Sequence, residues 1–322
     1  MNGEIHEKID RLGIWWDKIQ AAIPFYLIRG EAVTLIDTGP PQASGDAMTS
    51  ALDRFGLTPA DVGLVLNTHG HADHIGGNGV LQAAGRARVL IHREDAFYLD
   101  DRQRAFDEFY GVAAKALGDD HLLREEREAF LRHEEPSLRA DRLLEGGEVI
   151  RAGDNVELRV VPLPGHTGGS IGFYWEKEAL LIGGDAIQGL AGPTGSLPLI
   201  SDLTAYLKSI DRLREISPQT LVFTHAYRGV HLPPSTVRRG REVERYLSDS
   251  RELAMRLMEV LKQQAGSDVE RPFVEICDRV ISGLPAEMGF LPVGRQVTPN
   301  FSLSTVFWGL SWSPRGIKEV HE

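Results

Sequence analysis

Short apolar runs separated by polar or glycine-rich segments dominate residues 20–228 of this 322-residue chain. Runs of this length, flanked by turn-forming residues, predict buried β-strands, whereas apolar residues spaced three to four apart predict helices. The alternation of the two kinds of element indicates a layered α/β fold. We predict strands at residues 23–28, 32–36, 62–66, 88–92, 156–161, 170–175, 179–182 and 220–223, and helices at residues 44–55 and 203–216.

Residues 94–144 interrupt this alternation. They are rich in charged residues and carry apolar side chains at helical spacing, which predicts a helical insertion. Two interpretations stay open: a solvated surface hairpin, or a lid or wall over a functional site, because long insertions near sites are often functional. The apolar positions are Phe106, Phe109, Tyr110, Ala113 and Leu117.

The pattern changes again after Tyr227. Residues 235–264 and 269–281 have helical spacing, and the next convincing strand is residues 303–310. We therefore divide the chain into a main domain, residues 1–228, and a mostly helical C-terminal extension, residues 229–322. The extension either shapes a pocket or packs against the main domain or the partner in a homodimer, through Phe290, Leu291, Phe301, Phe307, Trp308 and Trp312.

Composition limits the classes of protein that the chain can belong to. The net charge of −11 weighs against a nucleic-acid partner, because phosphate binding needs a basic surface. The chain contains no run of about 18 apolar residues, so no membrane span is predicted. The polar, acidic N-terminus lacks a secretory pattern, and the single cysteine, Cys277, cannot form an intrachain disulfide. We therefore expect a cytoplasmic protein without nucleic-acid or membrane partners.

A dense cluster of potential metal ligands follows the predicted strand at residues 62–66. His69, His71, Asp73 and His74 lie within six residues, in a segment that ends in Ile-Gly-Gly-Asn. Imidazole and carboxylate are the ligands that suit zinc, manganese and iron. Dense clusters of these residues in glycine-rich loops seldom have a packing reason, so we interpret them as metal ligands.

Three further residues of the same kind follow other predicted strands. His166 lies in a glycine-rich turn, Asp185 follows Gly183 and Gly184, and His225 follows residues 220–223. Each one alone is more often structural than functional, but together with the first cluster they form a candidate metal site.

The spacing of these residues suggests how they could be arranged. His69 and His71 are two residues apart, so in an extended loop they project to the same side. Asp73 and His74 are adjacent and are expected to diverge, which suits ligands of two different ions. A bridging carboxylate such as Asp185 would hold two ions roughly 3.5–4 Å apart and let them share an acidified water.

The motif Thr-His-x-His-x-Asp-His at residues 68–74, with the later Gly-His-Thr, Gly-Asp and Thr-His elements, resembles the metallo-β-lactamase superfamily. The resemblance covers roughly residues 20–228 and implies a four-layer αββα sandwich with a dinuclear site at one edge, so that residues 1–228 would be the catalytic domain. It implies that one metal is held by His69, His71 and His166, that the other is held by Asp73, His74 and His225, and that Asp185 bridges them. Two divalent ions are expected, zinc first, with iron or manganese as alternatives.

Asp37, in the segment Ile-Asp-Thr-Gly, matches a position near the ligands in this superfamily. It would orient a ligand histidine, because ligand imidazoles usually donate their second ring N–H to such a group. The alternative is a turn former ahead of Gly39.

The resemblance also indicates a branch of the superfamily. Asp185 argues against antibiotic hydrolysis, because zinc β-lactamases generally lack this aspartate, and it favours hydroxyacylglutathione hydrolases, lactonases and thioesterases. The chain shows no basic residues typical of glutathione binding. Ala186-Ile187-Gln188 stands where acyl-homoserine lactonases often have a tyrosine. Tyr227 lies two residues after His225, the last histidine of the motif set. It could narrow the pocket, act as a hydrogen-bond donor, or be a simple local substitution.

We therefore expect a dinuclear metal-dependent hydrolase of a thioester or ester, acting on an acyl-CoA or a related small acyl substrate. A hydroxide that bridges the metals would attack the carbonyl carbon, and Asp73 would serve as both ligand and proton shuttle. The alternatives are a lactonase and an iron-dependent oxidoreductase similar to persulfide dioxygenases, which share this fold.

Overall fold

The computed structural model describes residues 3–17, 20–30, 32–41, 45–85, 87–131, 138–190, 195–264, 272–293 and 301–311. Over these residues the strands form two mixed β-sheets. The first sheet has its strands in chain order: β1 (Gly3–His6), β2 (Ile9–Trp16), β3 (Ala21–Ile28), β4 (Val33–Ile36), β5 (Val62–Leu66), β6 (Arg88–His92) and β7 (Arg142–Leu144). Strands β1 to β4 pair antiparallel, whereas β4 to β7 pair parallel.

The second sheet has the order β13-β12-β11-β10-β9-β8. Only the pair β11–β12 is parallel among its described strands, and helix α8 provides the crossover that a parallel pair requires. The strands are β8 (Val149–Gly153), β9 (Val156–Pro162), β10 (Ile171–Trp175), β11 (Leu180–Ile182), β12 (Thr220–Tyr227) and β13 (Ser235–Arg239).

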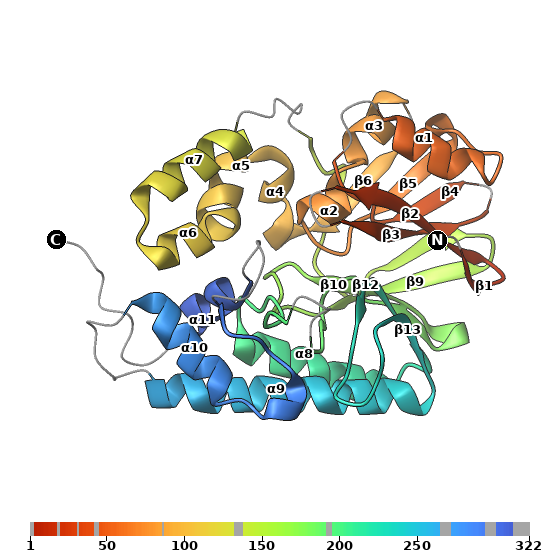
Figure 1. Ribbon diagram of the computed structural model, residues 1–322. Coiled ribbons are helices and arrows are strands. Elements are labelled where there is room, and N and C mark those ends of the chain that lie inside the picture. Colours follow the sequence, from red (N-terminus) through yellow and green to blue (C-terminus); the bar gives the residue numbers. More distant parts are fainter. Residues whose placement is uncertain are drawn as a thin grey trace.

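The sheets pack face to face and helices cover both outer faces (Figure 1). Leu66 of β5 and Phe173 of β10 belong to the core between the sheets. Helices α1 (Asp46–Asp53) and α3 (Asn78–Ala83) cover the first sheet, and α8 (Leu203–Ile216) and α9 (Arg241–Gln264) cover the second. The predicted four-layer αββα sandwich is thereby confirmed.

The insertion is helical, as predicted, except at its end. It contains α4 (Phe97–Asp100), α5 (Arg102–Ala105), a π-helical turn (Phe106–Tyr110), α6 (Val112–Leu117) and α7 (Asp120–Leu131). The predicted insertion reached residue 144, but residues 142–144 form β7, which pairs with β6 at the edge of the first sheet. Figure 1 shows α4–α7 grouped to one side of the sandwich and above helices α10 and α11.

Two predictions for the C-terminal region were wrong. The segment that begins at Ser235 starts as strand β13, which pairs with β12 and ends before Gly240, where φ is +53°. Residues 303–310 belong to helix α11 (Phe301–Ser311), which packs against α6, α9 and α10 (Phe273–Ser282). A short apolar run that is buried on several sides cannot be assigned to strand or helix by periodicity alone.

Strands β1, β2 and β8 were not predicted. The proposed domain boundary at residue 228 stays a prediction, and β13 and α9, which follow it, contribute to the second sheet and its covering layer. None of the helices in the described part of the chain is both long and apolar enough to cross a bilayer.

Candidate metal centre

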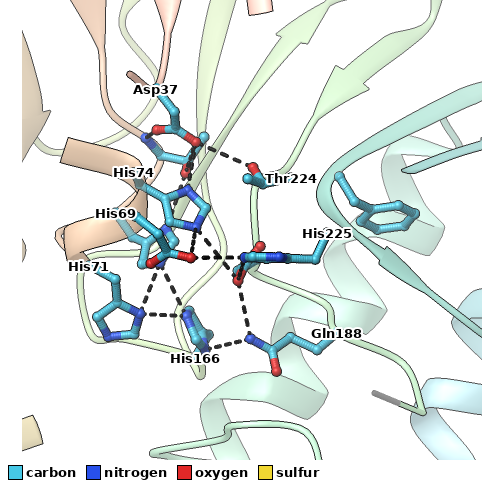
Figure 2. A network of polar contacts seen from close by, with 12 residues as sticks. Asp37, His69, His71, His74, His166, Gln188, Thr224 and His225 are labelled. Carbon is cyan, nitrogen blue, oxygen red and sulfur yellow. Dashed lines mark hydrogen bonds and ion pairs between the residues drawn. The ribbon is translucent and has the colours of Figure 1, made fainter. Parts of the chain in front are cut away.

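The predicted ligands gather at one edge of the sandwich, where several strands of both sheets end. The loop of His69 to His74 follows β5, His166 lies between β9 and β10, Asp185 follows β11, and His225 lies on β12. The carboxyl ends of parallel neighbours meet at the same sheet edge, so residues distant in sequence come together. Figure 2 shows the five histidines of this set pointing toward one another: His69, His71, His74, His166 and His225.

His69, His71 and His166 form the first group. His69 Nε2 lies 3.0 Å from His71 Nδ1, and His166 Nε2 lies 3.2 Å from His69 Nε2 and 2.9 Å from His71 Nδ1. Burial, with smaller contributions from neighbouring imidazoles, lowers the pKa of all three residues. The group is therefore three neutral imidazoles with ring nitrogens facing a common point, which is the form in which histidine binds a metal.

Asp73, His74 and His225 form the second group. Asp73 Oδ2 lies 3.0 Å from His225 Nε2 and 3.7 Å from His74 Nε2. The expected divergence of Asp73 and His74 was wrong. Both lie on the short helix α2 (Ala72–Ile75), where adjacent side chains differ by about 100° rather than the 180° of an extended chain.

Asp185 lies between the two groups. Its Oδ2 is 3.6 Å from His74 Nε2 and 3.4 Å from His225 Nε2, and the ligand atoms of His69, His74 and Asp185 also lie within 4.8 Å of one another. Gly184, at φ +53°, allows this loop to approach closely, since a side chain there would collide with Thr68. This is the position that a bridging carboxylate would occupy.

The donor atoms at this edge fit two divalent cations. His71 Nε2, His74 Nε2 and Asp185 Oδ1 are buried without a hydrogen-bond partner. His74 Nε2 and Asp185 Oδ1 thus lie buried in the ligand cluster without a hydrogen-bond partner. A buried polar atom of this kind destabilises the fold unless a bound ligand pairs with it.

Electrostatics favour positive charge in the second group. Burial opposes the charged form of His74 and His225, but the surrounding carboxylates outweigh it and raise the pKa of both residues. Conversely, burial alone would raise the pKa of Asp73 and Asp185, but the two imidazoles lower it below its usual range. An excess of carboxylate around these atoms is what cation binding requires.

Asp37 orients His74. Its Oδ2 lies 2.8 Å from His74 Nδ1, and it accepts hydrogen bonds from the backbone N–H and the hydroxyl of Thr68, both at 2.8 Å. The residue is buried and has φ +60°, a conformation that aspartate tolerates better than most residues. The contact with His74 supports the orienting interpretation, because it directs His74 Nε2 into the site, whereas residues 37–39 form no turn.

Comparisons with known proteins agree with this arrangement. A family profile described as Metallo-beta-lactamase superfamily matches residues 22–225. The chain belongs to the metallo-β-lactamase superfamily.

Individual relatives cover most of the chain. A protein of Methylococcus capsulatus named hydroxyacylglutathione hydrolase is 28% identical over 269 residues, which are 80% of this chain and 86% of that protein. A metallo-β-lactamase family protein from Thermus thermophilus superposes with a TM-score of 0.67 at 20% identity, over 96% of this chain and 94% of that one. A β-lactamase domain protein from Burkholderia ambifaria has a TM-score of 0.62 at 18% identity, over 98% of this chain and 90% of that one.

Asp95 is a buried supporting residue of this metallo-β-lactamase site that the sequence analysis missed. It follows β6 and accepts hydrogen bonds from Gly70 N at 2.9 Å, Gly169 N at 2.8 Å and Thr167 Oγ1 at 2.7 Å. One carboxylate thus ties together the two loops that carry the first group. The available signal was its place directly after a predicted strand, the same signal that marked the ligands.

Gln188 is a second residue that was missed. Its Oε1 accepts a hydrogen bond from Leu199 N at 2.8 Å, and its Nε2 lies 3.4 Å from Asp185 Oδ2 and 3.0 Å from His166 Nδ1. His166 Nδ1 lies 2.8 Å from the Leu199 carbonyl oxygen, so the protonated Nδ1 donates there and Nε2 faces the other ligands. Gln188 therefore links the loop of Asp185 to the support of His166.

The insertion and the C-terminal region wall the metallo-β-lactamase site on one side. The Phe109 ring lies 3.8 Å from the His71 ring, centroid to centroid, and Ala72 N donates a hydrogen bond to the Tyr110 hydroxyl at 2.9 Å. Trp308 of α11 stacks on Phe109 with a centroid distance of 5.7 Å. Of the two interpretations of the insertion, this contact favours a wall; whether it moves as a lid stays a prediction.

Tyr227 is buried beside the second group. Burial and the nearby Asp185 carboxylate raise its pKa well above its ordinary value, so its hydroxyl stays protonated and faces Asp185. This geometry favours a donor over a simple substitution among the three interpretations of Tyr227.

Proposed function

We propose that this protein is a dinuclear metal-dependent hydrolase that cleaves a thioester or ester of a small acyl substrate. The observation that carries the proposal is the position of Asp185 between two complete groups of three ligands. The similarity to a protein named hydroxyacylglutathione hydrolase supports thioester chemistry.

Each group would hold one cation, and the proposed metal is zinc. The first cation would be held by His69, His71 and His166, and the second by Asp73, His74 and His225. Asp185 would lie between the two. When bound, two such cations acidify a shared water and polarise the substrate carbonyl.

The chain's own residues prepare the site for this chemistry. Asp37 holds the Nδ1 proton of His74, and the Leu199 carbonyl holds that of His166, so both imidazoles offer Nε2. Asp73 Oδ2, 3.0 Å from His225 Nε2, is the proposed site that moves a proton during turnover.

The complete second group favours hydrolysis over the oxidoreductase alternative, which uses one iron. A lactonase shares the same site chemistry and stays the second candidate. A homodimer and a cytoplasmic location without membrane or nucleic-acid partners also stay predictions.

The test is to measure metal content and activity together. Protein loaded separately with zinc, manganese and iron is assayed on thioesters, esters, lactones, a persulfide and a cephalosporin. We expect two ions per chain, hydrolysis of thioesters or esters, and loss of activity on chelation that added metal restores.

Asp185→Asn should retain the fold and lose most turnover, whereas Glu157→Gln, an exposed carboxylate on β9, should match the parent. One iron per chain with persulfide oxidation and no ester hydrolysis would contradict the proposal.

A further inference from the structure

We propose that the cleft beside His166 binds a neutral aromatic acyl group, an inference that rests on the proposed hydrolysis at the metal centre. The cleft has a volume of about 460 Å³, within the range of pockets for small ligands. It is lined by the insertion, by Thr167 and Gly168 of the His166 loop, and by Trp308 of α11.

Four aromatic rings form one side of the cleft. Phe97 stacks on Tyr98 at 4.2 Å between centroids, Tyr98 meets Phe109 edge to face at 6.3 Å, and Phe109 stacks on Trp308 at 5.7 Å. All four line the cleft and are only partly buried. A wall of aromatic rings selects a flat aromatic group, because stacked and edge-to-face pairs contribute beyond their buried area.

The charges in the cleft argue against an anionic acyl group. Arg93 pairs with Glu145, and Arg104 pairs with Glu108 at 2.7 Å while its guanidinium lies 4.0 Å over the Phe97 ring. Carboxylates outnumber guanidinium groups among the lining residues, which include Glu94, Asp95 and Glu108. An anionic group would meet arginines that are already paired, and Glu94 would repel it.

The cleft suits the acyl side of the substrate. It opens beside His166, and the Phe109 ring lies 3.8 Å from the His71 ring, so the cleft adjoins the first ligand group. If the carbonyl is polarised at that group, the substituent on the carbonyl carbon extends into the cleft and the leaving group extends away from it.

The first experiment uses the metal-loaded full chain and thioesters that share one leaving group, N-acetylcysteamine. The acyl groups are phenylacetyl, cyclohexylacetyl, acetyl and 4-carboxyphenylacetyl. We expect phenylacetyl to have the highest kcat/KM and the carboxylated ring to be disfavoured. Trp308→Leu, which keeps an apolar side chain, should lower kcat/KM for phenylacetyl about 2- to 12-fold and lower it less for acetyl, which has no ring to contact Trp308. The matched control is Trp15→Leu, an exposed tryptophan on β2 that lines no part of the cleft.

The second experiment separates this inference from the proposed function. A neutral phenylacetyl ketone, with a methylene in place of the thioester sulfur, is titrated into the parent and Trp308→Leu by calorimetry. Binding that Trp308→Leu weakens supports the cleft even if no thioester is hydrolysed, which would overturn only the proposed function. Hydrolysis with equal rates for all acyl groups, or a Trp308→Leu effect of equal size for phenylacetyl and acetyl, would overturn the cleft assignment.

Discussion

Asp95 provides a sharp test of how the metal centre is held in shape. Its carboxylate, 1% exposed, accepts three hydrogen bonds that join the Gly70 loop to the loop of Thr167 and Gly169. Asp95→Ala would leave two backbone N–H groups and one hydroxyl without their acceptor. The two loops carry all three histidines of the first group, so the change should weaken metal binding as well as the fold.

The magnitude follows from those contacts. A hydrogen bond to a charged group contributes about 1.5–3 kcal/mol, so the gross loss exceeds that of a typical substitution. Burial raises the pKa of Asp95, although its hydrogen bonds act in the opposite direction. The ionised carboxylate is therefore disfavoured in the folded state at pH 7. Removing this carboxylate offsets part of the stability lost with the hydrogen bonds. We expect a net decrease of about 2–4 kcal/mol in the free energy of unfolding, or about 3–6 °C in Tm for a chain of this length.

Thermal unfolding and metal titration of the purified variant check both effects. Metal affinity should fall about 10- to 100-fold, as for other groups that support metal ligands. Asp95→Asn should rescue little, because its amide nitrogen would face a backbone N–H. The control is Glu157→Ala, an exposed carboxylate on β9. If Asp95→Ala melts within about 1 °C of the parent and binds metal equally well, the carboxylate does not hold the loops together.

Two further predictions concern the other supporting residues. Asp37→Asn keeps a residue that tolerates φ +60° but removes the negative charge beside His74. Affinity for the second metal should therefore fall about 10- to 100-fold, with little change in affinity for the first. If metal titration shows two ions bound at parental affinity, Asp37 does not orient His74. Gln188→Leu leaves the Leu199 N–H unpaired and removes the contact with Asp185. The value of kcat should fall by a larger factor than KM changes, and the free energy of unfolding should fall by about 1–3 kcal/mol. A parental kcat would show that Gln188 only fills space.

The candidate metal ligands could be identified in the sequence because they lie in loops that follow apolar runs. Strands β5 and β6 and helix α8 have the bounds that the hydrophobic pattern predicted. Once strands of a layered α/β fold are located, the residues at their carboxyl ends are expected to share one edge.

The role of the residues that support the ligands could not be predicted in this way, although Asp95 also follows a predicted strand. Asp95 and Gln188 act through backbone groups of Gly70, Gly169 and Leu199, whose approach depends on how separate loops pack. The same limit explains α11: its apolar residues pack against several helices at once, which removes the one-sided pattern that identifies an amphipathic helix.

This difference separates the site into two parts that should respond differently to substitution. The ligands and their supports lie on the strands, on the loops between them and on the short helix α2, so changes there should alter turnover for every substrate. The cleft wall combines Phe109 of the insertion with Trp308 of α11, two segments outside the sheets and their covering helices. Changes of Trp308 should affect substrates with an aromatic acyl group more than an acetyl thioester, because binding energy from remote substrate groups is lost only by substrates that have them.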